Sequence, residues 1–288
     1  MTIVEALTWA NNKLKKESGI DAPMLDAQLL LSHVLNTSKA FLFTHFDQEL
    51  TTAQLERFEA LSERRRRHEP IAYILGQKEF FRRSFFVNPF VLIPRPETEG
   101  LVEAAIHAAT EHDVLFLDIG TGSGAIAVTL AAETGRPVIA IDQSPRALSV
   151  AAQNAKAHAV ADAIQFLQGN LIEPVERQMV KPLHHVVLCA NLPYLTTREW
   201  QQTTRDVKEY EPREALDGGV DGLELYHALL ASLAVRRTDF PEKLTLIFEI
   251  DPGQHHSAPS LIRHFFPNAK LDVLEDLTKR ARLVQANL

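Results

Sequence analysis

The residues best equipped for chemistry form the tetrad Asn191-Leu192-Pro193-Tyr194 near the middle of the chain. An Asn carboxamide offers one acceptor and two donors to a planar group that carries a nitrogen atom. Pro193 stiffens the turn, and the ring of Tyr194 supplies a flat wall. These side chains predict a site that grips an amide or an amino-substituted base while its nitrogen is alkylated. The simpler interpretation is that Asn191 is only a turn residue, which is common in Asn-x-Pro strings.

The elements around the tetrad predict where it lies in the fold. It follows an apolar run, Val186 to Ala190, that we interpret as a buried strand. From about residue 113 strand-like and helix-like segments alternate, which predicts an α/β fold with a mostly parallel sheet and helices on both faces. Such sheets bind ligands where their strands open into loops. The expected strands span 114–119, 137–141, 163–167, 186–190, 244–250, 270–274 and 281–286, and the expected helices span 124–133, 145–157, 222–234 and 257–265.

A glycine-rich loop, Gly120-Thr121-Gly122-Ser123-Gly124, follows the first of these strands. Glycines let the backbone approach a ligand closely, and the next helix points its amino terminus at that position. With Ala125 the loop also satisfies the dinucleotide pattern G-x-G-x-x-G/A, so by itself it leaves the class of cofactor open. Asp142 ends the second strand, where a carboxylate accepts hydrogen bonds from ribose hydroxyls. Alternatively, Asp142 only caps the helix that begins at Pro145.

The third strand leads into Gly169-Asn170-Leu171. Asn170 could bond an adenine edge and Leu171 could cover its face, although this signal is weak alone. The tetrad favours a methyl-transfer cofactor over a dinucleotide, because a dehydrogenase has no need of a group that grips an amide. We therefore expect four strand ends to surround one cofactor.

The first 75 residues show a different period. Apolar residues recur there at helical spacing, beginning with Ile3, Ala6, Leu7, Ala10 and Leu14. A further helix is expected from Thr51, which forms a capping box with Gln54. The arginines at 64–67 end this helix, and we favour a solvated turn over a contact with RNA or an acidic protein. Residues 78–95 look extended and predict a hairpin that links two domains.

Composition excludes several classes of protein. The 288 residues carry a net charge of −7, so no global basic field attracts nucleic acid. The single cysteine, Cys189, lies in an expected buried strand, which excludes an internal disulfide and fits a reducing cytosol. No apolar run approaches the roughly 20 residues of a membrane span, and the spacing of Cys and His matches no zinc site. We expect a cytoplasmic protein that binds no metal.

Strings spread over nearly the whole chain resemble the release factor glutamine methyltransferases of bacteria and organelles. They are Pro70–Gly76, Ile93–Glu99, Gly120–Gly124, Asn191–Tyr194, Tyr210–Gly219, Asp221–Leu223, Phe248–Ile250 and Asp276–Arg280. The sequences RPETE and ALDGG are far more specific than the glycine loop. The resemblance implies a small helical domain (1–77) that helps to dock the substrate, a hairpin linker (78–95) and a Rossmann-like, seven-stranded class I methyltransferase domain (96–288).

The resemblance also implies an activity. Members use S-adenosylmethionine to methylate the side-chain amide nitrogen of the glutamine in the Gly-Gly-Gln motif of peptide-chain release factors. We expect these factors to be the partner of a monomeric enzyme that binds neither a membrane nor nucleic acid directly. By position, the loop Gly120–Gly124 would line the methionine end of the cofactor, Asp142 would hold the ribose, and Asn170 with Leu171 would flank the adenine. Asn191 and the residue-192 carbonyl would hold the glutamine amide beside the cofactor, with Tyr194 against it.

Two residues depart from the family pattern, which usually has Pro at position 192 and Asp at position 170. Leu192 retains its carbonyl but adds an N–H and loses a fixed φ, which loosens the loop. Asn170 retains an acceptor but loses the charge.

Three alternative functions stay open: an adenine-N6 nucleic-acid methyltransferase, the sister enzyme that acts on a ribosomal protein, and a weakly active cofactor-binding module, which Leu192 suggests. The acidic pI opposes the first, and the Asp217-Gly218-Gly219 string opposes the second.

Overall fold

Near residue 77 the helical spacing of apolar residues gives way to strand-forming runs, and there the computed structural model divides into two units. Unit 1 comprises Met1–Gln77 and Thr203–Glu211, and unit 2 comprises Lys78–Gln202 and Pro212–Leu288. The structure describes residues 1–110, 113–276 and 278–288. Leu277, within one of the strings quoted above, lies outside these ranges.

Unit 1 is helical, as the spacing of its apolar residues predicts. Its helices are α1 (Ile3–Leu14), α2 (Pro23–Leu35), α3 (Lys39–Thr44), α4 (Thr52–Arg66), α5 (Ile71–Leu75) and α11 (Arg205–Tyr210). Leu30, Leu31 and Phe58 are fully buried in its core. The predicted capping box of Thr51 and Gln54 is confirmed at the start of α4.

The arginine run that ends α4 is held by carboxylates. Arg65 is only 7% exposed and pairs with Asp26 at 2.7 Å. A prediction of a solvated turn is therefore wrong for Arg65, because the Asp26 carboxylate on α2 compensates its buried charge. The remaining pairs are Arg64–Glu69, Arg66–Glu63, Arg66–Glu17 and Arg67–Glu63.

Helix α11 joins unit 1 although it lies far along the chain. The Tyr210 hydroxyl donates a hydrogen bond to the Arg67 carbonyl at 2.8 Å. The chain thus leaves unit 2 after Gln202 and returns to it at Pro212. In this respect the structure differs from the expected single domain over 96–288, because the contacts of residues 203–211 are with the helical unit.

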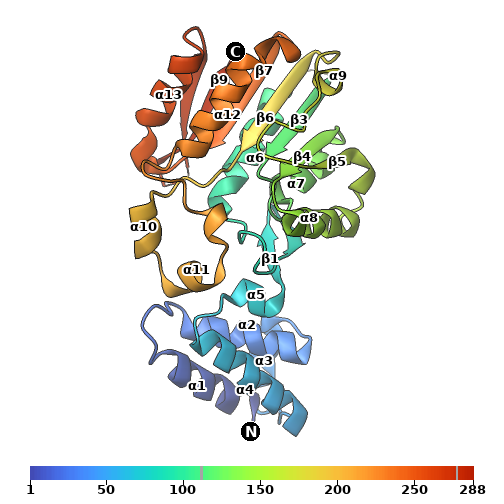
Figure 1. Ribbon diagram of the computed structural model, residues 1–288. Coiled ribbons are helices and arrows are strands. Elements are labelled where there is room, and N and C mark those ends of the chain that lie inside the picture. Colours follow the sequence, from blue (N-terminus) through green and yellow to red (C-terminus); the bar gives the residue numbers. More distant parts are fainter. Residues whose placement is uncertain (111–112, 277) are drawn as a thin grey trace. The chain divides into compact units, whose positions relative to one another are not determined.

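Unit 2 contains a small hairpin and a large sheet (Figure 1). The strands are β1 (Gln77–Phe80), β2 (Arg83–Phe86), β3 (Val114–Ile119), β4 (Val138–Asp142), β5 (Ile164–Gln168), β6 (His185–Ala190), β7 (Lys243–Glu249), β8 (Lys270–Glu275) and β9 (Ala281–Asn287). The α-helices are α6 (Glu99–Ala108), α7 (Ala125–Thr134), α8 (Pro145–Ala157), α9 (Arg177–Val180), α10 (Thr197–Gln202), α12 (Glu224–Val235) and α13 (Ser257–Phe265). Short 3₁₀ helices lie at η1 (Pro96–Thr98), η2 (Ala161–Ala163), η3 (Arg213–Ala215), η4 (Arg237–Asp239) and η5 (Pro252–Gln254).

The hairpin is shorter than the extended segment predicted over 78–95. Its strands β1 and β2 are joined by Phe81 and Arg82, whose φ angles of 48° and 60° fit the two-residue turn that strand twist favours. No strand is assigned between β2 and β3 among the described residues. Pro94 and Pro96 lie in this stretch, and a proline cannot donate to a sheet ladder.

The large sheet has the strand order β5-β4-β3-β6-β7-β9-β8. It is parallel except for β9, which runs antiparallel to β7 and β8, so the predicted, mostly parallel α/β sheet is confirmed. The short connection between β8 and β9 explains the exception, because parallel neighbours need a long crossover. The direction of strand succession reverses at β3, which is where open α/β sheets bind their ligands.

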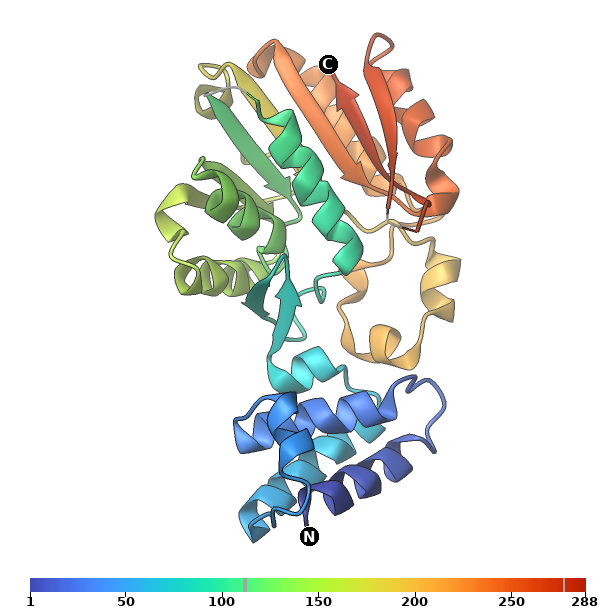
Figure 2. The same cartoon turned by 180° about the vertical axis from the view of Figure 1, so that it is seen from behind.

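Helices cover both faces of this sheet, as predicted (Figures 1 and 2). Leu115 and Leu117 point to the face packed by α12 and α13, whereas Val114 and Phe116 point to the face packed by α6 and α7. Cys189 is fully buried in the second core, as expected. None of the helices in the described part of the chain combines the length and apolar character needed to cross a bilayer.

Candidate active site

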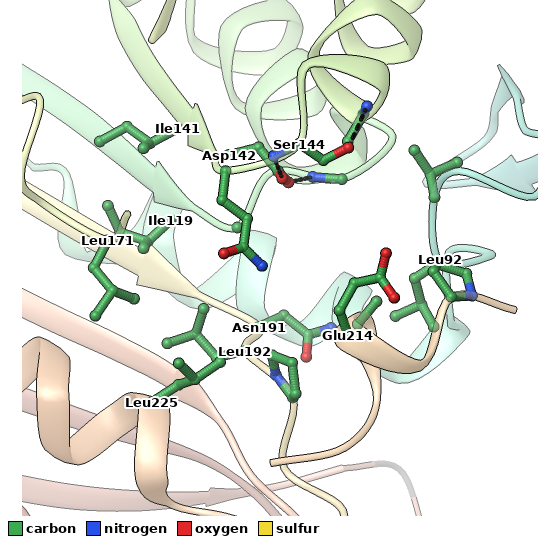
Figure 3. Close-up of a pocket in the computed structure, with 18 of the residues that line it drawn as sticks. Leu92, Ile119, Ile141, Asp142, Ser144, Leu171, Asn191, Leu192, Glu214 and Leu225 are labelled. Carbon is green, nitrogen blue, oxygen red and sulfur yellow. Dashed lines mark hydrogen bonds between the residues drawn. The ribbon is translucent and has the colours of Figure 1, made fainter. Parts of the chain in front are cut away.

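A crevice opens in unit 2 where the carboxyl ends of β3, β4, β5 and β6 meet (Figure 3). It has about 800 Å³ of empty space, part of which is open solvent. The predicted residues that line it are Gly120, Gly122, Asp142, Asn170, Leu171, Asn191, Leu192 and Pro193. The fold therefore brings the four predicted strand ends together.

Asp142 is fixed by backbone donors at the edge of the crevice. Its Oδ2 accepts from the Gly122 N–H and its Oδ1 from the Ser144 N–H, each at 2.9 Å. Burial raises the pKa of this carboxyl, and these N–H bonds oppose the rise. Each oxygen still has a lone pair for a ligand hydroxyl. The helix α8 is capped instead by Ser144, whose side chain accepts from the Ala147 N–H, so Asp142 is not the cap itself.

Thr121, Ser123 and Gly124 are not among the residues that line the crevice. Thr121 is buried, and its hydroxyl donates to Asp118 Oδ2 at 2.6 Å. Asp118 is fully buried at the end of β3, and burial raises its pKa to about 7. The second oxygen of Asp118 has no hydrogen-bond partner within the described residues. The Thr121–Asp118 hydrogen bond thus anchors the glycine loop to the buried end of β3.

The tetrad begins directly after β6. Asn191 faces the crevice, and its Nδ2 donates to Thr98 Oγ1 at 3.0 Å. Leu192 is 4% exposed, and its N–H donates to the hydroxyl of Tyr226 at 3.2 Å. That hydroxyl donates to the Glu249 carbonyl at 2.5 Å. The N–H that Leu192 has, and that the family's usual proline lacks, is therefore hydrogen-bonded.

Tyr194, the last residue of the tetrad, is held by a carboxyl of the neighbouring strand β7. It does not line the crevice, and its hydroxyl donates to Glu249 Oε1 at 3.3 Å. Burial, followed by the negative charge of Glu249, raises the pKa of Tyr194. Glu249 is itself fully buried at the end of β7, and burial raises its pKa to about 7.

A second loop holds the tetrad in place. The Gly218 N–H donates to the Leu195 carbonyl at 2.7 Å, and the Leu195 N–H donates to the Leu216 carbonyl at 3.2 Å. A Cβ added to Gly218 would lie 2.3 Å from the Pro193 carbonyl oxygen, and one on Gly222 would lie 2.1 Å from that of Tyr194. Only glycine permits this approach. The sequence analysis assigned no structural role to Gly218 or Gly222, although the specific ALDGG string, which contains Gly218, could have pointed to one.

Glu214 also lines the crevice and was not predicted. Figure 3 shows its carboxylate beside Asn191, on the opposite side from Asp142 and Ser144. Among the described residues that line the crevice there is no Lys, Arg or His. Two carboxylates without a cation suit a positively charged nucleoside and oppose a pyrophosphate. The crevice thus disfavours the dinucleotide interpretation of the glycine loop.

Comparison with known proteins matches residues 5–76 to the PrmC N-terminal domain and residues 116–210 to a methyltransferase domain. The release factor glutamine methyltransferase of Bacillus cereus is 34% identical over 100% of both chains. That of Dictyoglomus turgidum is 35% identical over 98% of this chain and 96% of its own, and that of Nitratidesulfovibrio vulgaris is 40% identical over 80% and 77%. Among solved structures, the hMettl16 catalytic domain in complex with MAT2A 3'UTR hairpin 6 has a TM-score of 0.55 at 11% identity over 82% of each chain, a likeness of fold alone.

Proposed function

Since this chain belongs to the release factor glutamine methyltransferase family, we propose that it moves a methyl group from S-adenosylmethionine to the side-chain amide nitrogen of a release-factor glutamine. The glutamine is that of the Gly-Gly-Gln motif. One observation carries the proposal. Asn191, Leu192 and Pro193 share a single crevice with Gly120, Gly122 and Asp142, so a group held by the tetrad lies beside a ligand held by the glycine loop.

The residues of the crevice fit S-adenosylmethionine. The Asp142 carboxylate retains lone pairs for ribose hydroxyls, and Ile119, Ile141 and Leu171 offer apolar walls to a base. Asn170 lies at the same rim and can bond the edge of the base. The Asp142 and Glu214 carboxylates complement the positive charge of a sulfonium. When bound, the cofactor supplies an electrophilic methyl group on that sulfonium.

The protein's own task is to orient a weak nucleophile. The lone pair of an amide nitrogen is delocalised into its carbonyl, so alignment contributes more than activation. In our proposal Asn191 Oδ1 and the residue-192 carbonyl accept the two hydrogens of the glutamine amide. Positive charge develops on nitrogen as the N–C bond forms, which strengthens both hydrogen bonds in the transition state. The Glu214 carboxylate favours the same charge, and the extra proton leaves to solvent after transfer.

The test is incubation with isotope-labelled S-adenosylmethionine and a purified release factor, followed by mass mapping of the modified residue. We expect one methyl group on the glutamine of the Gly-Gly-Gln motif, and none on a release factor in which that glutamine is Ala. Asn191→Ala should abolish transfer and leave S-adenosylhomocysteine binding by calorimetry nearly unchanged. Asn268→Ala, at an exposed position outside the crevice, is the matched control. Methylation of RNA, DNA or a ribosomal protein in place of the release factor would refute the assignment.

A further inference from the structure

Glu214 places a negative charge in the part of the crevice that holds the tetrad. It is an exposed residue of the crevice wall, and its carboxylate lies beside Asn191 (Figure 3). Burial raises the pKa of Asp142, and the charge of Glu214 contributes to that rise. The two carboxylates therefore act on the same space, where they stabilise a ligand that carries a positive charge.

The cation next to Glu214 in the sequence is engaged elsewhere. The guanidinium of Arg213 pairs with Asp217 at 2.7 Å, and its Cζ lies over the Trp200 ring, 4.2 Å from the ring centroid. Within residues 1–110, 113–276 and 278–288 the Glu214 carboxylate has no hydrogen-bond or ion-pair partner. Its charge is therefore available to a ligand in the crevice.

Backbone hydrogen bonds tie the turn that carries Glu214 to the tetrad. Leu195 directly follows the tetrad, and its N–H donates to the Leu216 carbonyl at 3.2 Å. The Leu216 N–H in turn donates to the Arg213 carbonyl at 3.0 Å. The backbone of Glu214 is thus held in place beside Asn191 before any ligand binds, and a charge that is already in place costs little reorganisation.

We propose that Glu214 is a specificity-determining residue that favours binding of S-adenosylmethionine relative to S-adenosylhomocysteine, the product of transfer. This inference rests on the proposed function, because transfer requires the sulfonium next to the amide that the tetrad holds. When the S–CH₃ bond breaks and the N–CH₃ bond forms, the bonding electron pair stays on sulfur and cancels its charge. Glu214 therefore attracts the charged cofactor and loses this attraction once the product has formed, which favours product release.

Calorimetric titration of the full chain, without release factor, tests this role. The quantity to compare is the Kd of S-adenosylhomocysteine divided by the Kd of S-adenosylmethionine. Glu214→Gln should lower this ratio about two- to fivefold, the range of a solvent-exposed ion pair, and Glu214→Lys should lower it about tenfold because the charge is reversed. The Kd of S-adenosylhomocysteine should change less than about twofold in Glu214→Gln. Glu103→Gln is the matched control, since it removes the same charge from an exposed position of α6 outside the crevice and should leave the ratio unchanged.

Sinefungin separates the effect of the charge from that of the methyl group, because an amine-bearing carbon takes the place of its methyl sulfonium. Its Kd should follow that of S-adenosylmethionine in every variant, and high salt should reduce the difference between wild type and Glu214→Gln. An unchanged ratio, or equal weakening of all three ligands, would overturn the inference even if release factor is methylated. The expected shift in the ratio without methylation of release factor would refute only the proposed function.

Discussion

Removal of the Tyr226 hydroxyl should destabilise this protein because the departure at position 192 depends on it. The hydroxyl accepts from the Leu192 N–H at 3.2 Å and donates to the Glu249 carbonyl at 2.5 Å. Tyr226 is 2% exposed and Leu192 is 4% exposed, so water cannot replace either bond. In Tyr226→Phe the Leu192 N–H is left buried without its partner. A proline at position 192 would have no N–H to lose.

The magnitude follows from the groups that lose their partner. A buried donor left unsatisfied costs about 1–3 kcal/mol, so Tyr226→Phe should lower the free energy of unfolding by about 2 kcal/mol in the Leu192 protein. In the Leu192→Pro background the same change should cost less, about 1 kcal/mol, because no buried N–H loses its acceptor and only the hydroxyl's own proton, shared between the Glu249 and Ala190 carbonyls, is removed. Pro193 already biases residue 192 to extended backbone, which suits proline. The cost of removing the apolar Leu192 side chain from its surroundings cancels in a double-mutant cycle.

Urea denaturation of the four proteins, followed by far-UV circular dichroism, measures the coupling between the two positions. We expect the Tyr226→Phe penalty to be smaller by at least about 1 kcal/mol when residue 192 is Pro. Equal penalties in the two backgrounds, within about 0.5 kcal/mol, would refute the idea that Tyr226 satisfies the Leu192 N–H. In that case the loop would tolerate Leu192 for a different reason.

Two further predictions concern the loop that holds the tetrad and the carboxyl beneath the glycine loop. Gly218→Ala should reduce methyl transfer to release factor at least about tenfold, because its Cβ would lie 2.3 Å from the Pro193 carbonyl oxygen. Gly100→Ala is the control and should retain activity, because its Cβ meets no atom closer than 3.9 Å. Equal rates of methyl transfer for the two variants would contradict the close approach of Gly218 as the cause. Because the pKa of Asp118 is raised, the folded state binds more protons than the unfolded state between about pH 4 and 7. The stabilisation from protonated Asp118 is therefore complete below about pH 4 and is lost as the pH rises to about 7. The free energy of unfolding falls over this range by no more than about 1.4 kcal/mol per pH unit. Asp118→Asn should therefore gain stability relative to wild type between pH 5 and 7.5 in urea denaturation, and parallel curves for the two proteins would exclude this pKa shift.

The amino-acid sequence by itself determined the seven strands of the large sheet, the helices α7, α8, α12 and α13, and the residues at the strand ends. Apolar runs and a period of 3.6 residues are local properties, so they predict elements such as β6 and α8 without tertiary information. Because parallel strands end at a common edge, the same pattern predicts that Gly120, Asp142 and Asn191 meet in one crevice. The pattern failed where local signals are absent, as for residues 203–211, which were expected in the domain over 96–288 but belong to unit 1.

Only the tertiary structure decided which side chains support the tetrad. The Asn191–Thr98 hydrogen bond joins residues 93 positions apart, and the Tyr194–Glu249 bond joins residues 55 apart. No period in the sequence encodes such pairs, because they depend on how η1, β6 and β7 are packed together. The family strings showed that Thr98, Gly218 and Glu249 belong to a pattern. Their contacts with Asn191, Pro193 and Tyr194 followed only when buried polar groups were matched with their partners in space.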